Sequence, residues 1–225
     1  MSLICIENLI DEATVTRLRS WLDAATFEDG RATAGGSAAL VKRNEQVSSD
    51  PSNSDPKLEE MQSLVEDLLW DHDLFDAAAQ PKEILSPIFS RYSPGMSYGT
   101  HMDNALMGEM RIDMSITLFL SDPSTYDGGE LVIDFSTGTR AIKLPAGSAV
   151  LYATTAPHRV AEVTRGQRLA MVTWIRSFVR DPAAREILLD LKTAHDRLFT
   201  QIGESPETDL LAKTYTNLLR RWVED

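Results

Sequence analysis

The chain has 225 residues, of which 43% are hydrophobic and 25% charged, which is ordinary for a globular protein. Its formal net charge of −12 argues against a large nucleic-acid-binding surface, because phosphate contacts need clustered lysines and arginines. The single cysteine, Cys5, excludes an intramolecular disulfide and a cysteine-rich zinc site. No apolar run approaches the roughly 20 residues that span a bilayer, and the N-terminus lacks signal-peptide features, so we expect a cytoplasmic protein that does not bind membranes.

The first third of the chain predicts two helices separated by polar loops. Residues 11–25 place Val15, Leu18 and Leu22 at amphipathic helical spacing. Residues 27–39 are rich in Gly, Ala and Ser and predict a loop or hairpin, and residues 47–57 predict a polar, turn-rich segment. A second helix is expected from about Leu58 to Trp70.

From residue 84 the apolar pattern changes to period two. About seven short runs of alternating or β-branched residues follow, separated by Pro, Gly and Asp turns: ILSPIFSRY, DMSITLFLS, GGELVIDF, AIKL, GSAVLYAT, HRVAEV and QRLAMVTWIRSFV. This is typical of an antiparallel sandwich or jelly-roll barrel. We therefore expect a mainly β, cupin-like core (a double-stranded β-helix) at about residues 84–178, within a domain that covers residues 1–180.

After Asp181 the sequence again predicts helices. Residues 183–202 and 208–223 carry apolar side chains every three or four positions, so residues 181–225 are expected to form a C-terminal helical segment. The apolar stripe of the first helix comprises Ile187, Leu188, Leu191, Ala194 and Leu198. It is compatible with packing onto the barrel and equally with formation of a homo-oligomer.

The stretch SYGTHMDNALM, residues 97–107, contains the chemistry-bearing residues. His101 and Asp103 are two positions apart, so on an extended strand their side chains project to one face. Burying both is costly unless something pairs with them. His158 begins a later strand, and two histidines with one carboxylate form the facial triad of non-haem Fe(II) oxygenases. Metal binding by these three residues is our prediction.

Arg168 follows His158 by ten residues, in GQRLAMVTW. A dicarboxylate co-substrate that chelates iron at one end needs a fixed cation at its other end, and guanidinium binds carboxylate in a bidentate manner. The spacing alone leaves other interpretations open. His101 and Asp103 could belong to a surface turn, and Arg168 could form a cross-strand ion pair.

Two longer similarities favour the oxygenase interpretation. The segment RYSPGMSYGTHMDN resembles the region before the metal ligands in prolyl-4-hydroxylase-type 2-oxoglutarate dioxygenases. Nearly the whole chain resembles the bacterial PKHD-type hydroxylases, which depend on iron and 2-oxoglutarate, through TAGGSAALVKRNEQ, HMDNALM, LFLSDPSTYDGGEL, KLPAGSAVLY and VTRGQR.

The resemblance implies a role for each matching residue. It makes His101, Asp103 and His158 the Fe(II) ligands and Arg168 the partner of a 2-oxoglutarate carboxylate. Tyr92 matches a tyrosine that lines the co-substrate pocket. It also implies hydroxylation of a substrate with O2, release of succinate and CO2, and L-ascorbate as the reductant that keeps iron reduced.

Several other residues have simpler interpretations. His72 is expected at a solvated helix end, and His195 is expected to be a surface or packing residue of the C-terminal segment. Gly128 and Gly129 predict a turn rather than a phosphate site. Lys42, in VKRNEQ, is a candidate for the cavity wall for which the sequence supplies no mechanism, as is its neighbour Asn44.

The positions on the Arg168 strand that share its face, Ala170, Val172 and Trp174, are expected to form part of an apolar wall. A non-catalytic cupin-like protein that binds a metal or a small acid as a sensor is the alternative function, since fold alone does not define activity. The substrate is open: a free amino acid, a peptide, a protein side chain and a metabolite are all compatible with the sequence.

Overall fold

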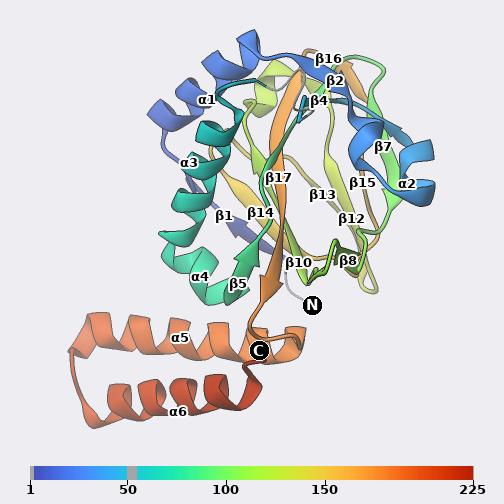
Figure 1. Cartoon of the computed structure of the whole chain (residues 1–225). Coiled ribbons are helices and arrows are strands. Elements are labelled where there is room, and N and C mark those ends of the chain that lie inside the picture. Colours follow the sequence, from blue (N-terminus) through green and yellow to red (C-terminus); the bar gives the residue numbers. More distant parts are fainter. Residues whose placement is uncertain (1–2, 50–54, 225) are drawn as a thin grey trace.

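The structure, a computed structural model, describes residues 3–49 and 55–224. Two antiparallel β-sheets face each other, helices cover one of them, and a helical hairpin extends from one end of the barrel (Figure 1). This is the predicted mainly β, jelly-roll core with a C-terminal helical segment. None of the described helices is both long and apolar enough to cross a bilayer.

The larger sheet has eight strands in the order β1-β14-β10-β17-β6-β4-β2, with β5 also paired to β17. Its strands are β1 (Ile4–Ile6), β2 (Phe27–Asp29), β4 (Glu45–Val47), β5 (Pro81–Ile84), β6 (Ile88–Tyr92), β10 (Met114–Phe119), β14 (Ala149–Ala153) and β17 (Arg168–Ser177).

The smaller sheet has the order β13-β12-β15-β7-β3. Its strands are β3 (Lys42–Arg43), β7 (Ser97–His101), β12 (Leu131–Phe135), β13 (Gly138–Ile142) and β15 (His158–Val160). Two further pairs join β8 (Leu106–Met107) to β9 (Met110–Arg111) and β11 (Asp127–Gly128) to β16 (Val163–Arg165).

Side chains along β17 point alternately into the hydrophobic core and into the pocket. Leu169, Met171 and Ile175 lie in the apolar cluster that the larger sheet shares with the N-terminal helices. The intervening positions, from Arg168 to Trp174, line the cavity between the sheets. Because successive side chains of a strand point to opposite faces, one ten-residue strand supplies both the core and one wall of the pocket.

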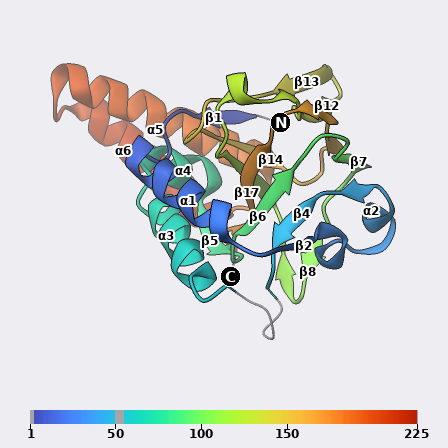
Figure 2. The ribbon, with the colours of Figure 1, turned by 90° about the horizontal axis from the view of Figure 1, so that it is seen from above.

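Four α-helices lie before β5 in the chain: α1 (Glu12–Ala24), α2 (Gly36–Leu40), α3 (Leu58–Trp70) and α4 (Asp73–Ala79). The helices α1 and α3 lie side by side against the larger sheet in both views (Figures 1 and 2). Their buried apolar faces, Leu18 and Val65 included, belong to the same cluster as Leu169 and Met171. The carboxylate of Asp11 caps α1 by accepting a hydrogen bond from the backbone N–H of Thr14. The helices thereby shield one face of the sheet and leave the other face for the pocket.

The C-terminal hairpin consists of α5 (Pro182–Ile202) and α6 (Pro206–Trp222), which pack against each other and extend away from the barrel (Figure 1). Asp181 caps α5, and Ser205 and Thr208 form a capping box at α6. The hairpin core includes Leu188 and Trp222. Ile187, predicted as part of the apolar stripe, is 45% exposed.

Local structure differs from the sequence prediction in three places. Residues 27–39, predicted as a loop or hairpin, contain β2, a 3-10 turn at Gly30–Thr33 and most of α2. Helix α4 was not predicted, since its seven residues are too few for a clear period. Strand β7 ends at His101, so Asp103 lies beyond the strand rather than on it. Part of the predicted turn segment 47–57 lies outside the described residues.

Candidate metal and co-substrate site

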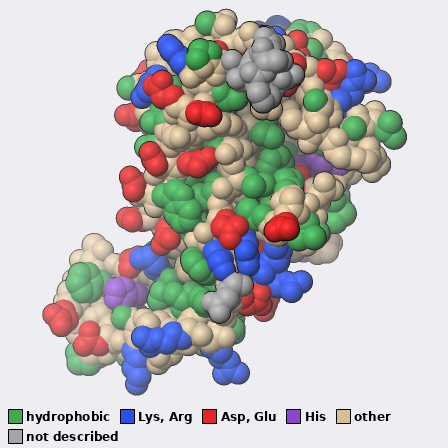
Figure 3. Space-filling model, viewed as in Figure 1, with side chains coloured by type: hydrophobic (Ala, Val, Ile, Leu, Met, Phe, Trp, Pro, Cys, Tyr) green, Lys and Arg blue, Asp and Glu red, His purple; other side chains and the backbone are tan. Residues whose placement is uncertain are grey.

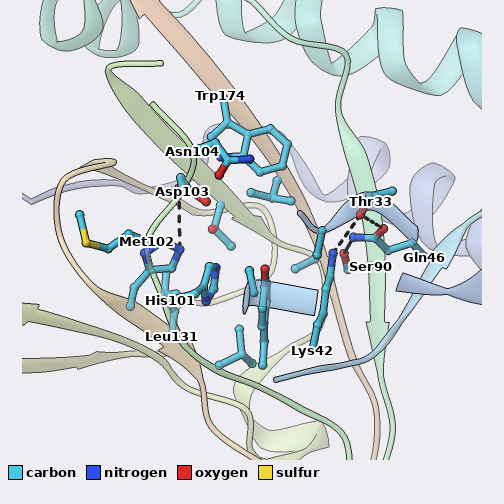
Figure 4. A pocket seen from close by; sticks show the side chains of 18 of the residues that line it. Thr33, Lys42, Gln46, Ser90, His101, Met102, Asp103, Asn104, Leu131 and Trp174 are labelled. Carbon is cyan, nitrogen blue, oxygen red and sulfur yellow. Dashed lines mark hydrogen bonds and ion pairs between the residues drawn. The ribbon is translucent and has the colours of Figure 1, made fainter. Parts of the chain in front are cut away.

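Three side chains from separate elements converge between the two sheets. His101 ends β7, Asp103 lies in the loop that follows, and His158 begins β15. The strands β7 and β15 are antiparallel neighbours, and His101 is paired with His158. One nitrogen or oxygen atom of each residue lies within 4.8 Å of those of the other two. Figure 4 shows His101 and Asp103 close together in the pocket. The pairing of β7 with β15 therefore brings together ligands that are 57 positions apart in the chain.

Backbone hydrogen bonds fix the orientation of both imidazoles. The Nδ1–H of His101 donates to the carbonyl oxygen of Gly99 at 2.9 Å, and the Nδ1–H of His158 donates to that of Ala156 at 3.0 Å. A carbonyl oxygen can only accept, so Nδ1 carries the proton in each ring and Nε2 keeps its lone pair. Metal-binding histidines have this arrangement, because the second nitrogen is held by an outer partner.

Asp103 is held by a serine that sequence reasoning missed. The Ser115 hydroxyl, from β10 of the opposite sheet, donates to Asp103 Oδ2 at 2.5 Å. The same oxygen lies 3.8 Å from His158 Nε2. Ser115 is fully buried in β10, and no local sequence pattern indicates its role, because the contact with Asp103 depends on how the two sheets face each other.

The surroundings of His101 favour a neutral ring. Burial, together with the neighbouring imidazole of His158, lowers the pKa of His101 to about 4. The Tyr98 ring stacks on His101 with centroids 3.6 Å apart, and burial raises the pKa of the Tyr98 phenol. A neutral imidazole is the form that can donate its lone pair to a metal.

Arg168 lies deep in the pocket as a buried cation, and no carboxylate among the described residues pairs with it. Its residue surface is 2% exposed, and its Nε and Nη2 atoms have no hydrogen-bond partner. The guanidinium lies 5.2 Å from the Tyr92 ring centroid, and burial raises the pKa of Tyr92 to about 12. A side chain at Gly129 would come within 3.1 Å of Arg168 Cδ, so the glycine leaves room for the arginine. The cross-strand ion pair considered for Arg168 does not form among the described residues.

The pocket that joins these groups has a volume of about 820 Å³, including its open mouth. Ala170, Val172 and Trp174 line it, as their shared face on β17 predicts. Leu131 and Val160 contribute apolar surface from the facing sheet. Trp174 Nε1 is buried without a partner. The result is an apolar chamber with a few buried polar atoms directed into it.

The remaining histidines lie apart from this site. His72 is the N-cap of α4, where its Nδ1 accepts a hydrogen bond from the backbone N–H of Phe75. His195 pairs with Asp196 on α5. Both match the structural roles expected for them. Gly128 and Gly129 have positive φ angles beside β16, in agreement with the predicted turn.

Sequence comparisons connect these residues with a known family. Residues 87–176 match the 2OG-Fe(II) oxygenase superfamily, and residues 183–224 match the PKHD-type hydroxylase C-terminal domain. A PKHD-type hydroxylase of Synechococcus elongatus is 50% identical over 99% of this chain and 100% of its own length. A PKHD-type hydroxylase of Maricaulis maris is 47% identical over 99% of this chain and 100% of its own length.

Solved structures show the same fold at low sequence identity. A Pseudomonas putida prolyl-4-hydroxylase aligns with a TM-score of 0.57 and 19% identity over 78% of this chain and 92% of its own. The 2-oxoglutarate-dependent carbocyclase SnoK of nogalamycin biosynthesis aligns with a TM-score of 0.57 and 15% identity, over 79% of this chain and 80% of its own. These similarities extend over most of the barrel-containing chain and support the fold assignment.

Proposed function

The chain belongs to the PKHD-type hydroxylases and is an Fe(II)- and 2-oxoglutarate-dependent dioxygenase, and from that premise we propose that His101, Asp103 and His158 bind its iron. The observation that carries this proposal is the convergence of two oriented Nε2 lone pairs and one carboxylate. Nitrogen and carboxylate donors on one face suit Fe(II) and leave coordination positions for other ligands.

We further propose that Arg168 and Tyr92 hold 2-oxoglutarate. A buried guanidinium whose Nε and Nη2 atoms lack acceptors is costly, and a carboxylate would satisfy them. Tyr92 lies beside it and has a hydroxyl that can donate a further hydrogen bond. The co-substrate would then be held at its distal carboxylate by Arg168, with its other end directed toward the triad.

The bound iron and 2-oxoglutarate supply the oxidising chemistry: O2 is consumed, 2-oxoglutarate is converted to succinate and CO2, and one oxygen atom enters a substrate C–H bond. The protein holds and isolates the reacting groups. Ser115 fixes the Asp103 carboxylate, and the backbone carbonyls of Gly99 and Ala156 fix the two rings. Val172 and Val160 limit the entry of water into the chamber, which reduces side reactions of the reactive groups.

The wider assignment has further parts, which we also propose. The dioxygenase domain is residues 1–180, and residues 181–225 form the attached helical unit. L-ascorbate keeps the iron reduced, and the protein acts in the cytoplasm without binding nucleic acid or a membrane.

Charges of both signs are interspersed on the face in Figure 3, and the net charge is −12. Exposed Phe199, Ile202 and Leu210 on the hairpin support self-association, which a sizing experiment tests.

The function is tested with purified protein under anaerobic conditions. Addition of Fe(II) and 2-oxoglutarate should produce a weak metal-to-ligand absorption band, and exposure to O2 should release succinate. His101→Ala should lose both signals, whereas Lys213→Met, an exposed change on α6, should keep them. Binding of 2-oxoglutarate without any succinate release would favour the non-catalytic sensor. A His101→Ala protein that retains the band would refute the metal site.

A further inference from the structure

A buried lysine faces the same pocket without a carboxylate partner, and from it we propose that the substrate carries an anionic group, a carboxylate or a phosphate, that binds Lys42. This deepens the proposed function and rests on it. Lys42 is on β3, is 6% exposed and lines the cavity next to the triad. Figure 4 shows Lys42 and Thr33 on one side of the pocket and His101 and Asp103 on the other.

Neighbouring cations show how unusual Lys42 is. Arg31 forms an ion pair with Asp29, and Arg91 pairs with Glu45 at 2.8 Å. Both arginines are more exposed than Lys42, yet each has a carboxylate partner. In the part of the chain that the structure describes, no carboxylate lies within 4.0 Å of Lys42 Nζ. A buried ammonium without a counter-charge is costly and therefore needs a functional explanation.

A chain of neutral polar side chains orients the ammonium. Lys42 Nζ donates to Thr33 Oγ1 at 2.9 Å, and the Thr33 hydroxyl donates to Gln46 Oε1 at 2.5 Å. Gln46 in turn donates to Ser90 Oγ at 3.4 Å. These contacts fix the position of Nζ and use one of its three N–H donors. The neutral partners leave its charge uncompensated, and the remaining donors can bind an anion.

The positive charge of Lys42 is directed toward the catalytic space. Burial lowers the pKa of Lys42 to about 8, against the opposing effect of Asp103 and then Asp29. An anion bound beside Nζ would oppose this lowering and favour the protonated form. Under the proposed function the Asp103 carboxylate is committed to the metal and 2-oxoglutarate to Arg168, so the substrate is the remaining source of a close negative charge.

Lys42 and Arg168 occupy different parts of the pocket. Arg168 lies near the Tyr92 and Phe119 rings, 5.2 and 5.4 Å from their centroids. Lys42 Nζ lies 5.2 Å from the centroid of Tyr98, the ring that stacks on His101. Arg168 is thus available for 2-oxoglutarate beside Tyr92. Lys42 lies beside the Tyr98 ring, which stacks on His101, a proposed iron ligand. An anion at Lys42 would place the rest of the substrate beside the metal.

The rest of the pocket indicates what accompanies the anionic group. Ala38, Met102 and Met107 line the pocket, and Met102 is 54% exposed. The substrate we infer has an anionic group at Lys42 and an apolar part against these side chains. The net charge of −12 gives no general attraction for anions, so selection for one must come from a local cation such as Lys42.

The test uses matched probes on protein loaded with Fe(II) and 2-oxoglutarate under anaerobic conditions. Calorimetry measures the affinity for hippurate, for the neutral hippuramide, and for phenyl phosphate, which separates a carboxylate from a phosphate. In the wild-type protein, hippurate or phenyl phosphate should bind at least about tenfold more tightly than hippuramide, as expected for one charge-assisted hydrogen bond. Lys42→Met should remove this preference, Lys42→Arg should keep part of it, and Lys213→Met should leave it intact.

Several results would overturn the proposed role of Lys42 in binding the substrate. Equal affinity for charged and neutral probes, absent binding of both anions, or an unchanged preference in Lys42→Met would overturn the proposal. A tenfold loss of 2-oxoglutarate affinity in Lys42→Met would also overturn it, since the lysine would then serve the co-substrate. Thermal melting checks folding, and the melting temperature of Lys42→Met should not fall because the substitution removes a buried charge. Failure of the iron assignment is distinguished by absence of the metal-to-ligand band in the wild-type protein.

Discussion

The barrel pocket leaves some of its buried polar groups without hydrogen-bond partners, whereas the C-terminal hairpin, as far as the structure describes it, does not. Arg168 and Trp174 face the pocket with buried N–H groups that have no acceptor. In the hairpin, residues 182–222, the described residues include no such buried atom, and Ser205 and Thr208 cap each other across the start of α6. In the pocket, a ligand can supply the acceptors that these buried donors lack, whereas the satisfied, self-packed hairpin contributes stability.

The largest expected change in stability lies in the hairpin. Leu188 is fully buried in its core, so Leu188→Ala should lower the free energy of unfolding by about 2–5 kcal/mol. The neighbouring Ile187 is 45% exposed, and Ile187→Ala should cost less than about 1 kcal/mol. Chemical denaturation measures both. Similar losses for the two variants would show that the hairpin core is placed incorrectly, and a loss of 2-oxoglutarate affinity in either folded variant would link the hairpin to the pocket.

The next largest effect is on 2-oxoglutarate affinity, and it should differ between Arg168 and Arg165. Arg168→Met should weaken 2-oxoglutarate binding about 10- to 100-fold, because a charge-assisted hydrogen bond in a buried site is worth about 1.5–3 kcal/mol. Arg165→Met, which removes an exposed partner of Asp127, should change that affinity less than about twofold. Calorimetric titration of the anaerobic Fe(II) protein gives both values. Unchanged affinity in Arg168→Met would require another carboxylate site.

Ser115 tests whether the support of the metal ligand matters. Ser115→Ala removes the hydrogen bond to Asp103, and outer partners of this kind are worth about 10- to 100-fold in metal affinity or activity. We expect the lower part of that range, since the Asp103 carboxylate remains. Iron affinity is measured by competition with a chelator, and Ser124→Ala, at an exposed serine, is the control. An iron affinity equal to wild type would mean that Ser115 only fills space.

The smallest effect lies on the hairpin surface. Asp196 pairs with Lys192 one helical turn away, and its side chain is 52% exposed. Asp196→Asn should therefore lower stability by only about 0.3–0.5 kcal/mol, and less at high salt. Denaturation at two salt concentrations measures this. A cost comparable to that of Leu188→Ala would contradict the view that apolar packing holds the hairpin together.

Long periodic segments were predictable from the sequence, and short or distant relationships were less so. The helix expected from about Leu58 to Trp70 has those bounds, because its apolar residues recur at helical spacing. The alternation from Arg168 to Trp174 correctly indicated the pocket wall. Asp103 was expected on the strand and lies past its end, since a two-residue spacing does not reveal where β-pairing stops. Its contact with Ser115 depends on the facing sheet and has no local signal.

Lys42 illustrates the same limit in the site itself. The sequence VKRNEQ made Lys42 a candidate for the cavity wall but supplied no mechanism for it. Its burial follows from pairing of β3 with β7 and from contact with Thr33, neither of which local periodicity encodes. The absence of a nearby carboxylate is likewise a property of the assembled fold.

The central claim is that one Fe(II) ion is bound jointly by His101, Asp103 and His158. The most direct measurement is an anomalous difference map at the iron absorption edge, from crystals grown anaerobically with Fe(II) and 2-oxoglutarate. The account predicts one strong peak in contact with both Nε2 atoms and the Asp103 carboxylate, together with 2-oxoglutarate density that reaches Arg168. Iron bound elsewhere, or a peak without contact to these three side chains, would contradict it.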